Sequence, residues 1–381
     1  MQPSLSQKPL RSILVKPAGS VCNLACRYCF YLGKNISHKR NLPMRMSEET
    51  LRSLVKQMMR QGEREVSFCW QGGEPTLMGI EFYERAVEYQ IRFGRPGQVV
   101  GNSLQTNGVL IDRDWALFLR DARFLVGLSI DGPQHIHDRY RVSKGQGSWA
   151  SVMKALETLM RYEVPVNVLT VVNDYSVNFA DEIYSFHKQN GLTYMQFIPC
   201  VERRRDDPQE YASFTVPAEA YGRFLCRLFD LWWDDFQDGK PTTIIRWFDS
   251  VAANCAGLEP PECTLQTECG SYLVAEHNGD VFSCDFFVDS GHYLGNLHKT
   301  PLFDLLNSPQ QKSFGAAKVD LPSECRSCNW FYLCKGGCPK DRKGSGKEPR
   351  SNYLCGAYRE FFRHAESRLK ELAERAKPAL R

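Results

Sequence analysis

Residues 22–31, Cys-Asn-Leu-Ala-Cys-Arg-Tyr-Cys-Phe-Tyr, place Cys22, Cys26 and Cys29 in one short segment that follows an apolar run at 13–15. This spacing lets three thiolates converge from a single loop. A structural zinc site takes four ligands and is closed, and iron–sulfur clusters are also usually held by four cysteines. A cluster held by three cysteines leaves one iron open. We therefore predict an open-site iron–sulfur cluster here, with zinc or buried free thiols as the alternative.

Short apolar runs continue along the first 200 residues and alternate with helical patterns. They lie at 13–15, 66–70, 102–105, 125–130, 166–172 and 194–198. Strand–helix alternation predicts parallel βαβ units and therefore an α/β fold. Six such units suit an open or partial (β/α)6 barrel of the TIM type. In such folds the active site lies at the C-terminal ends of the strands.

The clearest helical pattern begins at Ser47, which is a plausible N-cap, and Gly62 can end it. Further helices are predicted at 80–93, 112–121, 148–162, 176–190, 217–237 and 356–376. The 217–237 helix is rich in aromatic residues, and core packing is the simpler reading of that stripe.

The character of the chain changes after residue 238. Eight of the fifteen cysteines lie between Cys263 and Cys355, and hairpins and loops replace the regular alternation. The segment 277–280, His-Asn-Gly-Asp, separates two apolar runs and predicts a tight hairpin. We therefore predict two domains, a barrel at 1–238 and a cysteine-rich domain at 239–381 that ends in a helix.

Composition excludes several classes of function. The net charge of +4 gives no support for nucleic-acid binding, and no apolar stretch is long enough to span a membrane. The N-terminal segment has no signal-peptide core. We therefore expect a cytoplasmic protein. Thiols stay reduced in the cytoplasm, so the fifteen cysteines are better explained as metal ligands than as disulfides.

The segment 22–31 resembles the signature of the radical S-adenosylmethionine superfamily. The resemblance implies that the open iron of a [4Fe–4S] cluster chelates S-adenosylmethionine, whose reductive cleavage releases a 5′-deoxyadenosyl radical. The segment 71–75, Gln-Gly-Gly-Glu-Pro, follows the second strand and resembles the glycine-rich motif that supports the methionine amino group. The glycines allow a close backbone approach to the ligand. The resemblance implies cofactor contacts from Tyr28, Gln71, Gly73, Glu74, Ser129, Arg141 and Val201.

Eight cysteines in the C-terminal region suffice for two four-iron clusters, and two zinc sites are the alternative. Spacing alone would assign Cys338 to the same group as Cys325, Cys328 and Cys334, which precede it in the same segment. The region resembles the SPASM extension of peptide-modifying radical enzymes, in which the ligation crosses over. That resemblance assigns Cys263, Cys269, Cys284 and Cys338 to one auxiliary cluster, and Cys325, Cys328, Cys334 and Cys355 to the other. Fully ligated clusters suit electron transfer.

A sharper resemblance, to anaerobic sulfatase-maturating enzymes, covers nearly the whole chain. It rests on the segments 103–108, 278–280, 283–286 and 333–338. It implies oxidation of a Cys or Ser of a sulfatase polypeptide to Cα-formylglycine. The radical takes the Cβ hydrogen, a base takes the thiol or hydroxyl proton, and an auxiliary cluster takes the second electron. It also implies a low-potential electron donor such as flavodoxin or ferredoxin.

Asp285 is the predicted catalytic base because it directly follows Cys284 and is therefore held beside a cluster. A carboxylate in such a place can accept a proton usefully. The alternative is a surface or capping aspartate.

Two other functions are weighed against formylglycine formation. Thioether formation in a ribosomal peptide uses the same scaffold, and many such relatives carry an N-terminal leader-binding domain. Only about a dozen residues precede the first strand here, which counts against that function. The other alternative is a non-catalytic electron carrier or a zinc-binding protein. Such a protein needs neither an open cluster nor the 71–75 motif, so both features argue against it. Cys69 and Cys226 lie in apolar patterns and are expected to be buried, whereas Cys200 and Cys255 receive no role.

Overall fold

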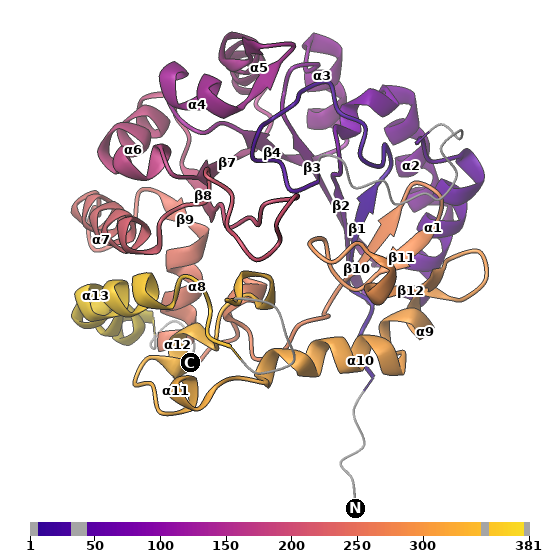
Figure 1. Cartoon of the computed structure of the whole chain (residues 1–381). Helices are drawn as coiled ribbons and strands as arrows, with labels where there is room; N and C mark the ends of the chain where they lie inside the picture. Colours follow the sequence, from indigo (N-terminus) through magenta and orange to yellow (C-terminus); the bar gives the residue numbers. More distant parts are fainter. Residues whose placement is uncertain (1–6, 32–43, 344–349, 377–381) are drawn as a thin grey trace, which may run out of the picture. The chain divides into compact units, whose positions relative to one another are not determined.

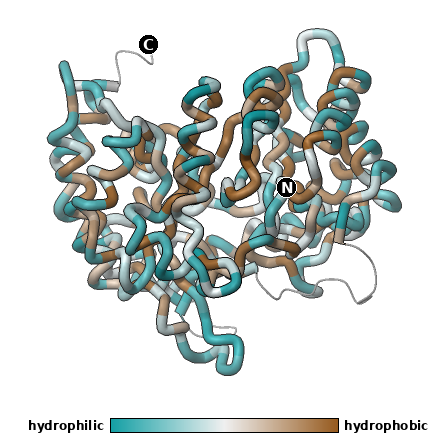
Figure 2. Tube along the Cα trace, turned by 90° about the horizontal axis from the view of Figure 1, so that it is seen from above, coloured by the Kyte–Doolittle hydropathy of each residue, from teal (hydrophilic) through white to brown (hydrophobic). Residues whose placement is uncertain are grey.

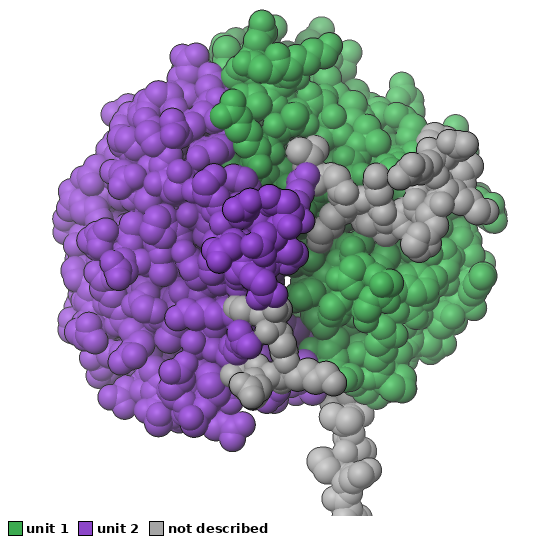
Figure 3. Space-filling model, in the orientation of Figure 1, with its two compact units in different colours: residues 1–129, 141–166, 270–315 green, residues 130–140, 167–269, 316–381 purple. Residues whose placement is uncertain are grey.

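The computed structural model describes residues 7–31, 44–343 and 350–376. The chain forms two compact units (Figure 3). Unit 1 contains residues 1–129, 141–166 and 270–315, and unit 2 contains 130–140, 167–269 and 316–381. Both units are therefore discontinuous in sequence. The division at residue 238 is a division by sequence and stays a prediction.

Unit 1 is built on parallel strands. Strands β1 (Ser12–Lys16), β2 (Glu65–Trp70), β3 (Val99–Thr106) and β4 (Phe124–Ser129) pair in this order, all in parallel. The hairpin of β10 (Leu273–Glu276) and β11 (Asp280–Phe282) pairs in parallel with β1 through β10, and β12 (Tyr293–Asn296) pairs with β11. The predicted strands and the predicted hairpin at 277–280 are confirmed.

The helices of unit 1 follow the apolar periodicity. Helix α1 (Glu48–Gln61) is capped by Ser47, whose Oγ accepts a hydrogen bond from the Thr50 N–H at 3.2 Å, and it ends at Gly62. It lies beside α2 (Ile80–Phe93), as Figure 1 shows. The others are η1 (Pro75–Met78), α3 (Arg113–Asp121), α5 (Trp149–Arg161), η4 (Ser290–His292), α9 (Leu302–Leu306) and α10 (Pro309–Ala316), with a small hairpin β5 (Val142–Ser143) and β6 (Gln146–Gly147). Hydrophobic and hydrophilic residues alternate along the helical stretches of the Cα trace (Figure 2).

Unit 2 continues the same pattern with β7 (Val166–Val172), β8 (Tyr194–Pro199) and the short β9 (Ile244–Ile245), which pair in parallel. Its helices are α4 (Gln134–Tyr140), η2 (Ser176–Asn178), α6 (Ala180–Gln189), α7 (Ala218–Asp234), α8 (Arg246–Cys255), η3 (Cys263–Leu265), η5 (Ala317–Val319), α11 (Ser323–Arg326), α12 (Phe331–Cys334), η6 (Pro339–Asp341) and α13 (Cys355–Ala376). Phe229 of α7 packs edge-on against Phe248 of α8 and Phe361 of α13. The aromatic stripe of α7 is therefore core packing, as predicted.

The carboxyl ends of the unit 1 strands collect the residues on which the site depends. Lys16 ends β1, Gln71 follows β2, Thr106 ends β3 and Ser129 ends β4. Parallel strands carry their carboxyl ends to one edge of a sheet, so these residues share that edge. No helix in the described ranges is long and apolar enough to cross a membrane.

Candidate active site and cysteine sites

The loop after β1 holds Cys22, Cys26 and Cys29 close together. Burial raises the pKa of the Cys22 thiol to about 12, and the charges of Glu74 and of the other two cysteines act in the same direction. The Cys22 Sγ accepts a hydrogen bond from the Leu24 N–H at 3.4 Å. A buried thiolate needs a cation to offset its lost hydration. Iron would supply that cation, so the loop fits a cluster.

The glycines after β2 let two backbones meet. A Cβ at Gly73 would lie 2.0 Å from the carbonyl oxygen of Val21, the residue before Cys22. The Gly73 N–H donates to Gly19 O, and the Glu74 N–H donates to Val21 O, both at 2.8 Å. The close approach that these glycines permit is therefore to the cysteine loop. The predicted approach to a cofactor stays a prediction.

The Glu74 carboxylate is fully buried and joins the ends of β2 and β3. It accepts hydrogen bonds from the hydroxyls of Thr76 and Thr106 at 2.6 and 2.7 Å, and from the N–H groups of Thr76 and Asn107 at 3.0 and 2.8 Å. Burial raises the pKa of this carboxyl, and the hydrogen bonds oppose the rise. With four protein donors, Glu74 positions its neighbours.

Asn107 is one of those neighbours, and its amide reaches the cysteine loop. Its Nδ2 lies 3.6 Å from the Cys22 Sγ and 2.7 Å from the Asn23 Oδ1. Hydrogen bonds to a cysteine sulfur tune the potential of a cluster bound there. The sequence analysis quoted the segment 103–108, which contains Asn107, but gave this residue no role of its own, although its place two residues after the predicted strand at 102–105 was a usable signal.

Two further predicted cofactor residues have partners in the same unit. The Ser129 hydroxyl at the end of β4 accepts a hydrogen bond from the Gln105 amide at 3.0 Å. The Arg141 guanidinium carbon lies 5.4 Å from the centre of the Tyr28 ring, within cation–π range. Arg141 is buried, and its guanidinium stands beside the cysteine loop that carries Tyr28. Their contacts with a cofactor remain predictions.

Asp285 follows β11 and forms an ion pair with the Lys16 ammonium at the end of β1. Its other carboxylate oxygen accepts a hydrogen bond from the Gln71 amide at 3.0 Å. The Lys16 side chain is 1% exposed and the Asp285 side chain is 15% exposed. Asp285 is therefore neither a surface nor a capping residue. It is held at the strand edge, beside the residue that opens the 71–75 motif.

Aromatic residues of the cysteine loop enclose this ion pair. The Lys16 Nζ lies 3.5 Å from the centre of the Tyr31 ring. The Tyr31 hydroxyl donates a hydrogen bond to the Glu276 carboxylate, and burial raises the pKa of Tyr31 above its usual range. Phe30 packs on Phe286 with ring centres 4.9 Å apart. The neighbours of Asp285 in sequence thus pack against the neighbours of Cys29.

Four cysteines of unit 2 line one cavity of about 480 Å3. They are Cys325, Cys328, Cys334 and Cys355. Burial raises the pKa of the Cys334 thiol to about 11, and the charges of the other three cysteines add to the rise. The cavity has room for a group much larger than one ion, and the described residues include no three His, Cys, Asp or Glu side chains arranged for a single metal ion. Four thiols around such a space, one buried and three partly buried, fit a cluster.

A left-handed turn separates Cys334 from Cys338. Lys335, Gly336 and Gly337 all have positive φ, at 48°, 80° and 66°. A Cβ at Gly336 would lie 2.6 Å from a Leu321 side-chain carbon, so the turn needs a glycine there. The turn leaves Cys334 on the cavity, whereas Cys338 is not among the residues that line it.

Cys263, Cys269 and Cys338 all lie near the buried Lys318. All three thiolates act on the buried Lys318, whose pKa is lowered by burial and raised by these charges. The Lys318 Nζ donates to the carbonyls of Cys263 and Thr264 at 2.8 and 3.0 Å. Cys338 is therefore off the cavity that Cys325, Cys328 and Cys334 line, and its assignment to the other cluster stays a prediction. Cys284, the fourth predicted ligand, belongs to unit 1, where its Sγ lies 3.5 Å from the Tyr272 hydroxyl.

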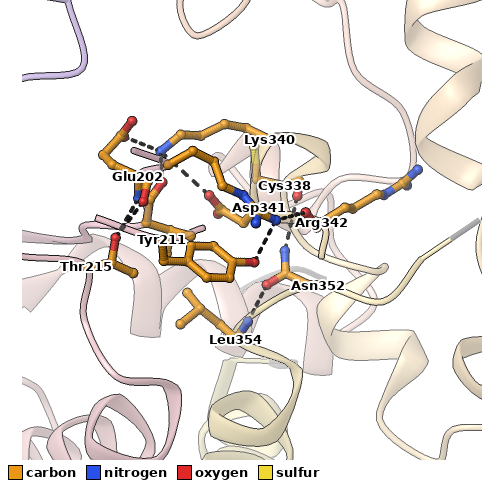
Figure 4. Close-up of polar contacts among 11 residues, drawn as sticks. Glu202, Tyr211, Thr215, Cys338, Lys340, Asp341, Arg342, Asn352 and Leu354 are labelled. Carbon is orange, nitrogen blue, oxygen red and sulfur yellow. Dashed lines mark hydrogen bonds and ion pairs between the residues drawn. The ribbon is translucent and has the colours of Figure 1, made fainter. Parts of the chain in front are cut away.

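A polar network in unit 2 links the segment of Val201 with that of Cys338 (Figure 4). The Lys340 Nζ donates to the Val201 carbonyl at 2.7 Å and to the Glu202 carboxylate at 2.6 Å. Lys340 stands two residues after Cys338, and the Asn352 amide donates to the Cys338 carbonyl at 3.1 Å. Val201, one of the predicted cofactor contacts, is therefore fixed through its own backbone.

Two family models match the chain. The radical SAM superfamily matches residues 17–186, and the SPASM iron–sulfur cluster-binding domain matches residues 267–329. A serine-type anaerobic sulfatase-maturating enzyme of Bacteroides thetaiotaomicron is 38% identical over 98% of this chain and 94% of its own length. A cysteine-type anaerobic sulfatase-maturating enzyme of Clostridium perfringens is 37% identical over 97% of this chain and 100% of its own length.

This chain belongs to the family of anaerobic sulfatase-maturating enzymes.

Solved structures agree with that assignment. The structure described as native anSMEcpe with bound AdoMet has a TM-score of 0.88 and 35% identity, and it covers 96% of this chain and 100% of the other. A second, with AdoMet and the Cp18Cys peptide, has the same TM-score and identity. These matches confirm the predicted radical SAM fold with a SPASM extension. They also show that this sulfatase-maturating enzyme has an α/β fold and belongs to the radical enzymes.

The cysteines outside the predicted cluster sites differ from expectation in one respect. Cys69 and Cys226 were expected to be buried, but both are only partly buried, whereas Cys200 is buried. Cys69 lies on β2 and Cys226 on α7, and the side chains of both remain partly exposed there. None of the three lies next to a predicted cluster cysteine in the sequence of this sulfatase-maturating enzyme.

Proposed function

We propose that this chain oxidises a Cys or Ser side chain of a sulfatase polypeptide to Cα-formylglycine. The observation that carries the proposal is the set of contacts among the partly buried Asp285, the buried Lys16 and the partly buried Gln71 at the strand edge next to the cysteine loop. The Lys16 ammonium and the Gln71 amide hold the Asp285 carboxylate beside the cysteine loop, where the radical is expected to form. Membership of the sulfatase-maturating family supports the choice of substrate.

The proposed cofactors are S-adenosylmethionine and three [4Fe–4S] clusters. Cys22, Cys26 and Cys29 would hold the open cluster, which with S-adenosylmethionine supplies a 5′-deoxyadenosyl radical. Cys325, Cys328, Cys334 and Cys355 would hold one auxiliary cluster, and Cys263, Cys269, Cys284 and Cys338 the other. The proposed contacts with S-adenosylmethionine are those of Tyr28, Gln71, Gly73, Glu74, Ser129, Arg141 and Val201.

Asp285 would take the proton of the substrate thiol or hydroxyl. Lys16 and Gln71 fix both carboxylate oxygens, so the base is already oriented when the substrate arrives. The side chain loses one Cβ hydrogen atom, one proton and one electron in total. A serine then becomes the aldehyde directly, and a cysteine becomes a thioaldehyde that water hydrolyses.

The remaining partners follow from this chemistry. A one-electron donor of low potential, such as flavodoxin or ferredoxin, would start each cycle. We place the enzyme in the cytoplasm, where its fifteen free cysteines would stay reduced.

The base is tested by Asp285→Asn, which removes the proton acceptor and keeps the size of the side chain. We expect about 10²- to 10⁴-fold less formylglycine, with unchanged iron content and continued cleavage of S-adenosylmethionine. The matched control is Asp304→Asn, an exposed position on α9 of the same unit. Full product formation by Asp285→Asn would remove this residue from the mechanism.

The substrate is tested by anaerobic incubation of the reconstituted enzyme with sulfatase-derived peptides that carry Cys or Ser at the target position. Mass spectrometry distinguishes the aldehyde from a thioether, and about twelve irons per chain are expected. A thioether product would favour the alternative peptide modification, and zinc without sulfide would exclude a radical enzyme.

A further inference from the structure

Lys318 is a fully buried lysine on the short helix η5. Its ammonium donates to the carbonyl oxygens of Cys263 and Thr264 at 2.8 and 3.0 Å. From the other side, the Arg342 guanidinium donates to the carbonyls of Ala317, Lys318 and Asp320. The position of Lys318 is therefore fixed at both its backbone and its side chain.

A second buried lysine offers a direct comparison. Lys16 is equally buried, and its ammonium is paired with the Asp285 carboxylate. Lys318 forms no ion pair with a carboxylate in the described ranges 7–31, 44–343 and 350–376. The charges that act on it most are those of Cys269, Cys263 and Cys338, followed by the like charge of Arg342.

A buried ammonium without a counter-charge is costly, and carbonyl dipoles offset only part of that cost. Backbone carbonyls alone do not explain why a lysine occupies this place, since a neutral residue would avoid the penalty. The proposed auxiliary cluster carries a net negative charge, because four thiolates outweigh the charge of its iron–sulfur core.

We propose that Lys318 is the counter-charge of the auxiliary cluster to which Cys263, Cys269 and Cys338 of the same unit are assigned, and that its ammonium raises the reduction potential of that cluster. Reduction adds one more negative charge to the cluster, and a nearby cation stabilises the reduced form more than the oxidised form. Burial strengthens the effect because little water screens it. Lys318 would thereby make this cluster the better acceptor for the electron that leaves the substrate.

This proposal rests on the proposed function only because it requires that the auxiliary cluster is present. It is tested by Lys318→Met, which removes the charge and nearly keeps the length of the side chain, in the reconstituted holoenzyme. Redox titration followed by electron paramagnetic resonance gives the potential of each cluster. The signal of the relevant cluster is the one that Cys338→Ala abolishes. We expect Lys318→Met to move that potential to more negative values and to leave the other auxiliary cluster unchanged.

Two further variants complete the test. Lys318→Arg keeps the charge and should retain a potential near that of the wild type, and Lys240→Met removes an exposed lysine of the same unit and should change neither potential. Unchanged potentials in Lys318→Met would overturn the inference while leaving the proposed function intact. If Lys318→Met fails to hold the cluster, retention by Lys318→Arg supports a charge effect, and loss in both variants overturns it. A wild-type protein without auxiliary clusters would instead contradict the proposed function.

Discussion

Lys16 and Asp285 are 269 positions apart in the chain, yet the buried ammonium of Lys16 pairs with the partly buried carboxylate of Asp285 at the carboxyl end of β1. The pairing arises because β10 lies next to β1 in parallel, with Lys16 in register with Glu276. The hairpin of β10 and β11 then carries Asp285 back to the same edge. The predicted base is thus placed by strand pairing between the two ends of unit 1.

Replacing Lys16 by methionine should leave the Asp285 carboxylate buried without its cation. A hydrogen bond to a charged group contributes about 1.5–3 kcal/mol, so loss of this contact should slow formylglycine formation by about 10- to 100-fold. Cleavage of S-adenosylmethionine should continue. The ratio of formylglycine to 5′-deoxyadenosine measures the effect, and the exposed Lys299→Met is the control. An unchanged ratio would show that Lys16 does not position the base.

Replacing Gly73 by alanine should displace the cysteine loop, because the new Cβ would lie 2.0 Å from the Val21 carbonyl oxygen. We expect the protein to lose about four irons per chain together with its cleavage of S-adenosylmethionine. Gly101→Ala on β3 is the matched control, since its Cβ would make only ordinary contacts, with Ser67 at 3.7 Å and the Val66 carbonyl oxygen at 4.0 Å. Normal iron content in Gly73→Ala would mean that the loop can shift without loss of the cluster.

Much of this arrangement could be predicted from local sequence signals. The strand runs, the Ser47 cap and the hairpin at 277–280 each depend on residues that are neighbours in the chain, and all appear where expected. The short helices α4 and α8 were missed, since seven and ten residues give little periodicity. Glu74 was found from the 71–75 motif, but its hydrogen bond with the Asn107 N–H joins the ends of β2 and β3, and no local pattern encodes that contact. The Lys16 ion pair depends on strand order and was invisible for the same reason.

Cys334 and Cys338 should serve different clusters although they are four residues apart. The left-handed turn at Lys335, Gly336 and Gly337 leaves only Cys334 on the four-cysteine cavity. Single alanine variants of the two cysteines should therefore lose different signals in electron paramagnetic resonance, each with loss of up to about four irons. Loss of the same signal in both variants would contradict the crossover.

His187 should make the stability of unit 2 depend on pH. Burial lowers its pKa to about 3, and its Nε2 lies 2.8 Å from the Thr170 hydroxyl. The unfolded chain binds a proton below about pH 6.5, whereas the folded histidine stays neutral, so unfolding takes up a proton. The stability from this group is complete above that pH and is lost as the pH falls, by about 1.4 kcal/mol per pH unit.

The dependence can be measured by urea unfolding of the wild type and of His187→Gln between pH 7.5 and 5.5, followed by circular dichroism. Glutamine can keep a hydrogen bond to Thr170 and cannot take up the proton, so the variant should lose less stability on acidification. The exposed His298→Gln should behave like the wild type. Equal slopes for the wild type and His187→Gln would show that the buried imidazole is not the group that titrates, since both chains would then take up the same number of protons on unfolding.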